Sequence, residues 1–575
     1  MSSRPSGIKE TWNTKLGVIL AVSGSAVGIG NFLRFPGQAA QYGGGAFMIA
    51  YVISFLILGL PMGWAEWTIG RLGGKRGFSS CPGILNAVWK HPLAKYIGVI
   101  GVVIPVCMYM YYVYIEAWCM GYAVNFALGN MHFDSVEESR SFWEHFVGFH
   151  ADGSAFGFGV KQVGMFLILA FLFNFYFIYR GVAKGIEIFC KYALPSLIIL
   201  AIVILIRVLT MGTPDTAQPY NNVNNGLGFL WNPVKTYLQE NVEGQWVNSS
   251  ELIGVGLIEE KKEFASLNPE QYRVYEKSVL EQLMSPRLWL AAASQIFFSL
   301  SVGFGVIMVY SSYMKPDDDV VLGNLTSASA NEFCEVALGG LITVPAAYAF
   351  LGAAGIVGQG IFGLGFNVFP MVFSNMSFGN FFGSLFFGLL FLAAITSSIS
   401  QLQPGLAFLE EALNVRRKAA IALLLVITSF GAMLVVWFSK DVRALDTFDF
   451  WVSTFMIYMI ATILMLIFTT QLGVKEGFEE ASRGAAFPIP KIFWPITKFL
   501  CPMFLLTIFF LWLIIDVIGV GGAGIDHHIT DLFGGKGKTV QPVAWFCVIT
   551  IVILYTVFCM LVSRVKRYKE FQERV

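Results

Sequence analysis

The sequence predicts an all-α integral membrane protein with about twelve transmembrane helices. Hydrophobic residues make up 56% of the 575-residue chain and charged residues only 13%, whereas soluble domains carry about 25% charged residues. The mean hydropathy is +0.66, and apolar runs of about 20 residues, the length that crosses a bilayer as a helix, recur along the chain. The net charge of +1 gives no reason to expect a nucleic-acid partner.

The apolar runs follow one another with short basic loops between them. They begin near Trp12, Gly43, Lys95, Lys161, Ile186, Arg287, Asn331, Phe382, Lys418, Asp449, Ile492 and Pro542. Basic residues gather in alternate loops, within 71–95, 180–191, 416–418, 475–498 and 564–569. Because basic loops stay on the cytoplasmic side, we expect a multi-pass protein of the plasma (inner) membrane with both termini in the cytoplasm.

The first apolar run, residues 12–37, is interrupted near its middle by small and polar residues. These are Ser23, Gly24, Ser25, Gly28, Gly30 and Asn31. A broken helix at membrane depth is tolerated only where its freed backbone groups face protein or a polar cavity. Taken alone, this run fits either a binding site at membrane depth or close helix packing through small residues.

The sixth apolar run, residues 288–313, repeats the interruption. Its middle carries Ser299, Ser301, Gly303 and Gly305. Interrupted helices at corresponding positions of two halves point to the central site of an inverted-repeat transporter. We therefore expect a five-plus-five inverted repeat in which helices one and six are discontinuous. The expected organisation is a cytoplasmic N-terminus (1–11), a first repeat (12–212), a long extracellular loop (213–286), a second repeat (287–471), helices eleven and twelve (472–563) and a cytoplasmic C-terminus (564–575).

The long loop at 213–286 is either functional or an insertion that the outer face tolerates, and we favour the insertion. Its section 259–282 is rich in Lys and Glu and is expected to form a surface helix. The eight cysteines show no metal-ligand spacing, and the six histidines lie outside the apolar cores. With no nucleophile–base pair or metal cluster at membrane depth, an enzyme and an organic cofactor are not expected.

Short motifs along the first ten helices resemble one known family. Residues 24–36 read Gly-Ser-Ala-Val-Gly-Ile-Gly-Asn-Phe-Leu-Arg-Phe-Pro. Further motifs are Gly-Gly-Gly-Ala-Phe at 43–47, Glu66-Trp67, Gly70-Arg71, the segments 111–116, 185–187 and 295–301, Asn331-Glu332, Thr396-Ser397-Ser398 and Asp449-Phe450-Trp451. They resemble the neurotransmitter:sodium symporter family, above all its bacterial, leucine transporter-like amino-acid members. The resemblance implies sodium-coupled symport of an amino acid by alternating access.

The resemblance also implies two Na⁺ sites built from oxygen ligands. The first would use the Ala26 carbonyl, the side chains of Asn31, Ser299 and Asn331, and the carboxylate of the substrate. The second would use the carbonyls of Gly24, Val27 and Ala393 and the hydroxyls of Thr396 and Ser397. The alternative for these two hydroxyls is back-bonding to the preceding helical turn, which is common in membrane helices.

For the substrate, the resemblance implies a carboxylate bound by the amides near Ile29 and Gly30 and by the Tyr112 hydroxyl. Gly28 stands where the family's monoamine carriers have an aspartate, so an amino acid that brings its own carboxylate fits better than an amine. The ammonium group would meet the carbonyls of Ala26, Phe298 and Ser299 and the Ser301 hydroxyl. The side-chain pocket would comprise Ser25, Met108, Tyr112, Phe298, Ser301, Phe304, Ser397 and Gln401.

Two pocket residues depart from the leucine-transporter pattern. Met108 replaces a valine, and Gln401 stands where an isoleucine is usual. A buried amide needs partners, so Gln401 either receives a polar substrate side chain or bonds its own helix. The substrate is expected to be a neutral amino acid.

Two charge pairs and one further carboxylate have expected roles. Arg34 with Asp449 would close the outer vestibule, and Lys9 with Glu411, where the family has arginine and aspartate, would form an inner latch unless both are simply solvated. Glu335 stands where chloride-dependent relatives have a serine, near Tyr51, Gln295 and Ser299. Its carboxylate would stand in for chloride, which predicts chloride independence.

Two other classes of membrane protein, a nutrient sensor and an enzyme, fit the sequence less well than a symporter does. A nutrient sensor would bind amino acid and Na⁺ without concentrative flux, and the short termini without a signalling domain count against it. A membrane enzyme lacks the necessary residues. The expected partners are a small amino acid and the lipid bilayer, with the chain as a monomer or dimer.

Overall fold

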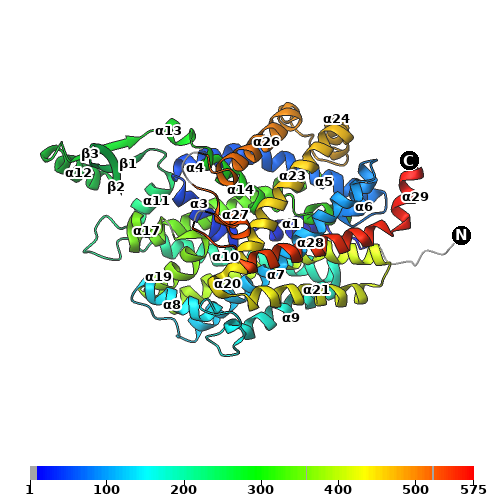
Figure 1. Ribbon diagram of the computed structural model, residues 1–575, viewed down its shortest axis with the longest axis horizontal. Coiled ribbons are helices and arrows are strands. Elements are labelled where there is room, and N and C mark those ends of the chain that lie inside the picture. Colours follow the sequence, from blue (N-terminus) through cyan, green and yellow to red (C-terminus); the bar gives the residue numbers. More distant parts are fainter. Residues whose placement is uncertain (1–9, 358, 521–523, 536, 575) are drawn as a thin grey trace.

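The computed structural model describes residues 10–357, 359–520, 524–535 and 537–574 as an elongated helical bundle with a small sheet at one end (Figure 1). Within these residues, nine helices are long and apolar enough to cross a membrane, and one bent pair makes a tenth. The nine are Gly45–Lys75, Ala94–Ala127, Gly164–Leu209, Val320–Ile356, Gly379–Leu413, Arg417–Trp437, Lys440–Ala481, Phe493–Val517 and Pro542–Ser563. The all-α membrane fold is confirmed; the count of twelve crossings and the five-plus-five repeat stay predictions.

The two spans expected at Asn331 and Asp449 begin earlier, at Val320 and Lys440. Asp319 caps the first of them, since its side chain accepts the N–H of Leu322 at 2.8 Å. After Val320 and Val321, the early turns of that helix include the polar residues Asn324 and Ser327, which are buried inside the protein. A search for apolar runs therefore places the start too late.

Both expected interruptions are present. The first span consists of α1 (Lys15–Ala26), α2 (Ile29–Phe32) and α3 (Arg34–Gln41), with a bend of 56° at the break. The sixth consists of α14 (Pro286–Leu300) and α15 (Val306–Ser312), separated by five non-helical residues. The discontinuity of helices one and six is thus confirmed.

The two longest helices, α7 (Ala94–Ala127) and α20 (Gly379–Leu413), pack along one another in the middle of the bundle. Glycines permit this approach, because a Cβ on Gly383 would lie 2.5 Å from the Phe126 ring and one on Gly405 would lie 2.7 Å from Val106. The pair forms a rigid support that carries Tyr112 and Ser397 to the centre of the molecule.

The long outer loop contains a small sheet that the all-α expectation did not include. Strands β1 (Lys235–Val242), β2 (Gln245–Leu252) and β3 (Tyr272–Lys277) are antiparallel in the order β2-β1-β3. Glu243 and Gly244 form the two-residue turn of the first hairpin, both with positive φ. The surface helix expected at 259–282 is correct only in its first part, where α12 (Val255–Leu267) lies. Its second part is β3, because Tyr272 and Val274 pack on the small apolar cluster of the sheet.

The remaining elements connect or cover this core. The helices are α4 (Gly45–Ser54), α5 (Leu60–Lys75), α6 (Cys81–Val88), α8 (Val136–Val147), α9 (Gly164–Gly181), α10 (Glu187–Leu209), α11 (Val223–Trp231), α13 (Val279–Leu283), α16 (Val320–Glu332), α17 (Leu341–Ile356), α18 (Gly360–Phe362), α19 (Phe369–Ser374), α21 (Arg417–Trp437), α22 (Arg443–Phe448), α23 (Ile457–Ile467), α24 (Val474–Ala481), α25 (Phe493–Pro495), α26 (Cys501–Trp512), α27 (His527–Phe533), α28 (Pro542–Ser563) and α29 (Lys566–Arg574). Short π-helical stretches include Val182–Ile186, Phe333–Gly340 and Asp449–Met456. The C-terminal helix α29 and the sheet lie at opposite ends of the long axis (Figure 1).

Candidate substrate and ion site

The break in the first span leaves backbone groups free at the centre of the bundle. Val27 and Gly28 have extended φ/ψ; the Val27 N–H still donates to the Ser23 carbonyl at 2.7 Å, whereas the Gly28 N–H leaves the helical hydrogen-bond ladder. The Asn31 side chain stabilises the break, because its Oδ1 accepts the Gly28 N–H at 2.8 Å. Unpaired amides at the start of a half-helix attract a carboxylate, and unpaired carbonyls before the break attract a cation.

The break in the sixth span faces the first one. Ser301, Gly303 and Gly305 all have positive φ, and at Gly305 a Cβ would lie only 2.2 Å from the Gly101 carbonyl oxygen. The freed Gly303 N–H donates to the buried Glu66 carboxylate. The Ser301 hydroxyl donates to the Ser25 carbonyl at 3.1 Å and so joins the two breaks.

The residues expected around the first Na⁺ form one buried hydrogen-bonded cluster. Asn31 Nδ2 donates to Asn331 Oδ1 at 2.8 Å, and Asn331 Nδ2 donates to Ser299 Oγ at 2.6 Å. Ala26, beside them in sequence, is also buried. Amide and hydroxyl oxygens at membrane depth suit a hard cation.

Glu335 lies at the edge of this cluster and is fully buried, at 0% exposure. Gln295 Nε2 and the Ser299 hydroxyl donate to its two oxygens. Asn331 Nδ2 donates to it at 3.2 Å and Asn31 Nδ2 at 3.4 Å. The Tyr51 hydroxyl, expected nearby, makes no hydrogen bond within the described residues. Four donors from three spans therefore surround one carboxylate.

The residues expected around the second Na⁺ lie where α1 meets α20. A Cβ on Gly24 would lie 3.4 Å from Thr396. The Ser397 hydroxyl is 3.5 Å from the Gly24 carbonyl and 3.2 Å from that of Ala393, and the Thr396 hydroxyl is 3.0 Å from the latter. Both hydroxyls back-bond their own helix, as the alternative interpretation holds, yet the Ser397 oxygen also lies close to the Gly24 and Ser25 carbonyls of α1. Val27, whose carbonyl is the remaining expected ligand, is the C-terminal cap of α1 at the break.

A small cavity between the two breaks collects most of the expected substrate residues. It is lined by Ser25, Ala26, Gly28, Gly30, Asn31, Met108, Tyr112, Phe298, Ser301, Phe304, Ser397 and Gln401. Ten of the twelve expected substrate-binding residues are among them. The exceptions are Ile29, whose N–H lies 3.4 Å from the Tyr112 hydroxyl, and Ser299, which was expected to contribute its backbone carbonyl. The cavity encloses about 20 Å³, room for about one water molecule, so it must widen to admit an amino acid.

Gly28 and Gln401 define the polar character of this cavity. A Cβ on Gly28 would lie 3.1 Å from both the Tyr112 and the Ser397 hydroxyl oxygens, so the space beside Gly28 is bordered by two donors. Gln401 is 4% exposed, and its Oε1 has no hydrogen-bond partner in the described structure. Of the two interpretations of Gln401, bonding to its own helix is therefore not what the structure contains.

The expected outer gate is not formed as an ion pair. No salt bridge joins Arg34 to Asp449 within the described residues; Arg34 Nη2 donates to Ser294 at 3.0 Å, and its guanidinium lies 4.3 Å from the Phe298 ring centroid. Asp449 instead accepts from the Tyr111 hydroxyl at 2.7 Å. Tyr111 belongs to the sequence motif at 111–116, which did not predict a role for it at the gate.

The expected inner latch between Lys9 and Glu411 stays a prediction, because Lys9 lies outside the described residues. The Glu411 carboxylate accepts the backbone N–H groups of Ser79 and Ser80 and the hydroxyls of Ser80 and Tyr568. The N-terminal segment is held by other contacts, namely an ion pair of Glu10 with Arg417 at 2.7 Å and a hydrogen bond from Trp12 Nε1 to the Tyr310 carbonyl at 2.9 Å.

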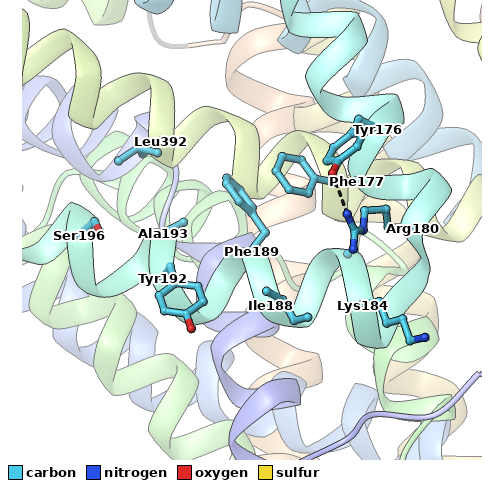
Figure 2. Close-up of a pocket in the computed structure, with 11 residues that line it drawn as sticks. Tyr176, Phe177, Arg180, Lys184, Ile188, Phe189, Tyr192, Ala193, Ser196 and Leu392 are labelled. Carbon is cyan, nitrogen blue, oxygen red and sulfur yellow. Dashed lines mark hydrogen bonds between the residues drawn. The ribbon is translucent and has the colours of Figure 1, made fainter.

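A larger hollow lies away from this site, on the surface of the protein between α9 and α10 (Figure 2). It measures about 410 Å³ and includes the exposed side chains of Tyr176, Arg180 and Tyr192. Arg180 donates to the Tyr176 hydroxyl at 2.8 Å (Figure 2). Exposed aromatic and basic residues are typical of a helix end at the membrane surface. We therefore place the substrate site in the smaller central cavity, where polar groups from several spans converge.

Two broken helices that face each other around a buried polar cavity define a membrane transporter. The sodium:neurotransmitter symporter family matches residues 9–139 and 270–519. This is more than half of the chain, and the protein belongs to that family. It is a sodium-dependent symporter and not an enzyme.

Similar proteins agree with this assignment. A sodium-dependent transporter of Haemophilus influenzae is 25% identical over 517 residues, covering 87% of this chain and 97% of its own. The sodium-dependent serotonin transporter of Drosophila melanogaster is 25% identical over 540 residues, covering 87% and 76%. The crystal structure of MhsT in complex with L-phenylalanine superposes with a TM-score of 0.67 at 25% identity, covering 87% of this chain and 99% of that one.

Proposed function

We propose that the protein couples the inward movement of two Na⁺ to the uptake of a neutral amino acid, without a need for chloride. It acts in the plasma (inner) membrane with both termini in the cytoplasm. The position of α29 opposite the outer sheet supports the placement of the C-terminus (Figure 1). MhsT, which shares the fold, binds L-phenylalanine.

The space beside Gly28 is the observation that favours an amino acid as the substrate. It lies between the Tyr112 and Ser397 hydroxyls and next to the amides that begin α2. These groups stabilise a carboxylate that the substrate brings with it. The same carboxylate would complete the ligands of the first Na⁺ beside Asn31 and Ala26. Substrate and Na⁺ then share one set of contacts, so each raises the affinity for the other.

The cavity is closed in this structure, which fits one state of an alternating-access cycle. On the outer side, the Arg34 guanidinium lies over the Phe298 ring. On the inner side, the hydrogen bond from Trp12 to the Tyr310 carbonyl keeps the N-terminal segment in place. In the proposed cycle, helices one, two, six and seven rock against three, four, eight and nine around the fixed site. The Tyr111–Asp449 hydrogen bond would open with the outer vestibule.

Transport in proteoliposomes tests the proposal. With an inward Na⁺ gradient, the purified protein is expected to accumulate a radiolabelled neutral amino acid, and accumulation should stop when Na⁺ is replaced by K⁺. Liposomes without protein and protein-containing liposomes with a collapsed gradient are the controls. Equal accumulation in Na⁺ and in K⁺ contradicts the proposal. Na⁺-dependent binding without flux indicates a sensor instead.

Replacing Gln401 by leucine is expected to shift substrate preference toward apolar side chains. The wild-type amide leaves a buried oxygen unpaired, and an unpaired buried polar group costs about 1–3 kcal/mol when an apolar side chain fills the cavity. We expect the affinity for apolar neutral amino acids, relative to that for polar ones, to rise about tenfold. Competition against a labelled amino acid measures this ratio of affinities.

The matched control is Gln403→Leu, the same change two residues along α20. Its Nε2 donates to the Tyr313 hydroxyl at 2.9 Å and does not line the cavity. This variant should leave the order of preference unchanged. An unchanged order in Gln401→Leu as well would show that the amide does not contact substrate.

A further inference from the structure

A cluster of two histidines and two aspartates lies between the start of α22 and the start of α27. It comprises Asp446, Asp526, His527 and His528, and the symport cycle proposed above uses none of them. The ligand atoms of Asp446, His527 and His528 all lie within 4.8 Å of one another. These three residues come from two segments that are distant in sequence and meet only in the folded protein.

The distances match those between the ligands of a small metal ion. Nε2 of His527 and Nε2 of His528 each lie 3.0 Å from the same oxygen, Asp446 Oδ2. In a tetrahedral zinc site with bonds of about 2.0–2.1 Å, neighbouring ligand atoms lie about 3.3 Å apart. The histidine rings lie side by side, with centroids 3.8 Å apart. A small outward shift of each group would admit an ion between the three atoms.

The surroundings of His528 prepare its Nε2 to be a ligand. Its Nδ1 lies 2.8 Å from Asp526 Oδ1, and its ring stacks on Phe450 at 4.0 Å between centroids. A ligating histidine usually gives its second N–H to a carboxylate, which fixes its tautomer and orientation. The Nε2 atom is buried and makes no hydrogen bond of good geometry within the described structure.

We propose that Asp446, His527 and His528 bind a divalent transition-metal ion, with zinc the best fit, and that Asp526 positions His528. Imidazole nitrogens with one carboxylate suit zinc and exclude Mg²⁺ and Ca²⁺, which prefer all-oxygen sites. His527 and Asp446 are 52% and 49% exposed at their side chains, which gives the ion access and leaves a fourth position for water.

The bound ion must compete with a proton. Burial opposes the charged form of His528, but the neighbouring carboxylates of Asp446 and Asp526 outweigh burial and raise its pKa to about 9. The metal binds the neutral imidazole. Measurements are therefore made at mildly alkaline as well as neutral pH, and the variants are compared at one pH.

The site would act on the outer end of the transport pathway, an effect that rests on the proposed symport function. Asp446 lies about one helical turn before Asp449, and Asp449 accepts the hydrogen bond of the Tyr111 hydroxyl at 2.7 Å. An ion that ties α27 to α22 would hold this end of the helix in place. Zinc is then expected to slow uptake without competing with the amino acid.

Zinc titration of the purified full-length protein in detergent tests the site directly, by calorimetry. One saturable site is expected in the wild type and in His150→Ala, which removes a lone histidine paired with Glu144 at 3.4 Å. Binding should be lost in His527→Ala and His528→Ala, and weakened about 10- to 100-fold in Asp526→Asn, the usual cost of removing such a positioning carboxylate. Excess Mg²⁺ or Ca²⁺ should not displace zinc, whereas a chelator should.

The outcomes separate this site from the transport function. Wild-type protein that takes up no zinc, or variants that bind it as the wild type does, overturn the proposal. Na⁺-induced thermal stabilisation checks that each variant is folded. If zinc binds as expected but uptake in proteoliposomes is unaffected, the metal site stands and its link to the gate fails. If no uptake is seen under any condition, the symport proposal fails while calorimetry still decides the metal site.

Discussion

Gly28→Asp is expected to abolish amino-acid uptake. The new Cβ would lie 3.1 Å from the Tyr112 and Ser397 hydroxyls, and its carboxylate would occupy the place we propose for that of the substrate. Two carboxylates there would repel, and an uncompensated buried charge costs about 3–5 kcal/mol, or roughly a thousandfold in affinity. Labelled uptake and substrate-induced thermal stabilisation in detergent measure the effect.

Two variants show whether charge at this position is the cause. Gly37→Asp makes the same change in α3, where a Cβ meets nothing within 4 Å, and should keep most of the activity. Gly28→Ala adds the Cβ without the charge and should lose much less than the aspartate variant. If Gly28→Asp still accumulates amino acids, or if Gly37→Asp fails equally, the carboxylate is not bound beside Gly28.

Glu335→Ser is expected to make uptake depend on chloride. In the wild type, Gln295, Ser299, Asn31 and Asn331 all donate to this one carboxylate. With serine at this position, the four donors would surround a space that no carboxylate fills, and a chloride ion could accept their hydrogen bonds there. Without chloride, uptake should fall at least about tenfold, because each buried donor left unpaired costs about 1–3 kcal/mol. Uptake in chloride and in gluconate, for both proteins, measures this.

Two further variants keep the chloride test specific. Glu335→Gln removes the charge but fills the space, so its uptake should fall and chloride should not restore it. Glu116→Ser removes another fully buried carboxylate, which binds Asn174 at 2.9 Å and Ser398 at 2.5 Å. Its defect should be insensitive to chloride. Wild-type uptake that itself requires chloride would refute the substitution of Glu335 for the anion.

The broken helices could be predicted from sequence because their cause is local. Residues 24–30 and 299–305 are rich in glycine and serine, which weaken a helix wherever it lies. The resemblance then predicted ten of the twelve residues that line the cavity. It placed the Ile29 amide and the Ser299 carbonyl there too, and these two residues do not line the cavity. The Ser299 hydroxyl donates to Glu335, a contact between two helices that the sequence does not give.

The gates show the same limit. The family resemblance paired Arg34 with Asp449, two opposite charges, yet Arg34 bonds Ser294 and Asp449 bonds Tyr111. The Lys9–Glu411 pair stays a prediction, because Lys9 lies outside the described residues, and Glu411 accepts hydrogen bonds from Ser79, Ser80 and Tyr568. Charge identifies candidates for a gate, but the neighbouring hydrogen-bond donors decide which partner is taken.

The sequence by itself determined that this chain spans the membrane, where its helices break and that a glycine stands at the centre of the proposed substrate site, since these follow from composition, local helix propensity and short motifs. Only the tertiary structure decided the sheet in the outer loop, the donors around Glu335, the free amide of Gln401 and the meeting of Asp446 with His527 and His528. The contacts of Glu335 and of Asp446 with the two histidines join segments far apart in the chain, and they are set by how whole helices pack rather than by the residues next to them.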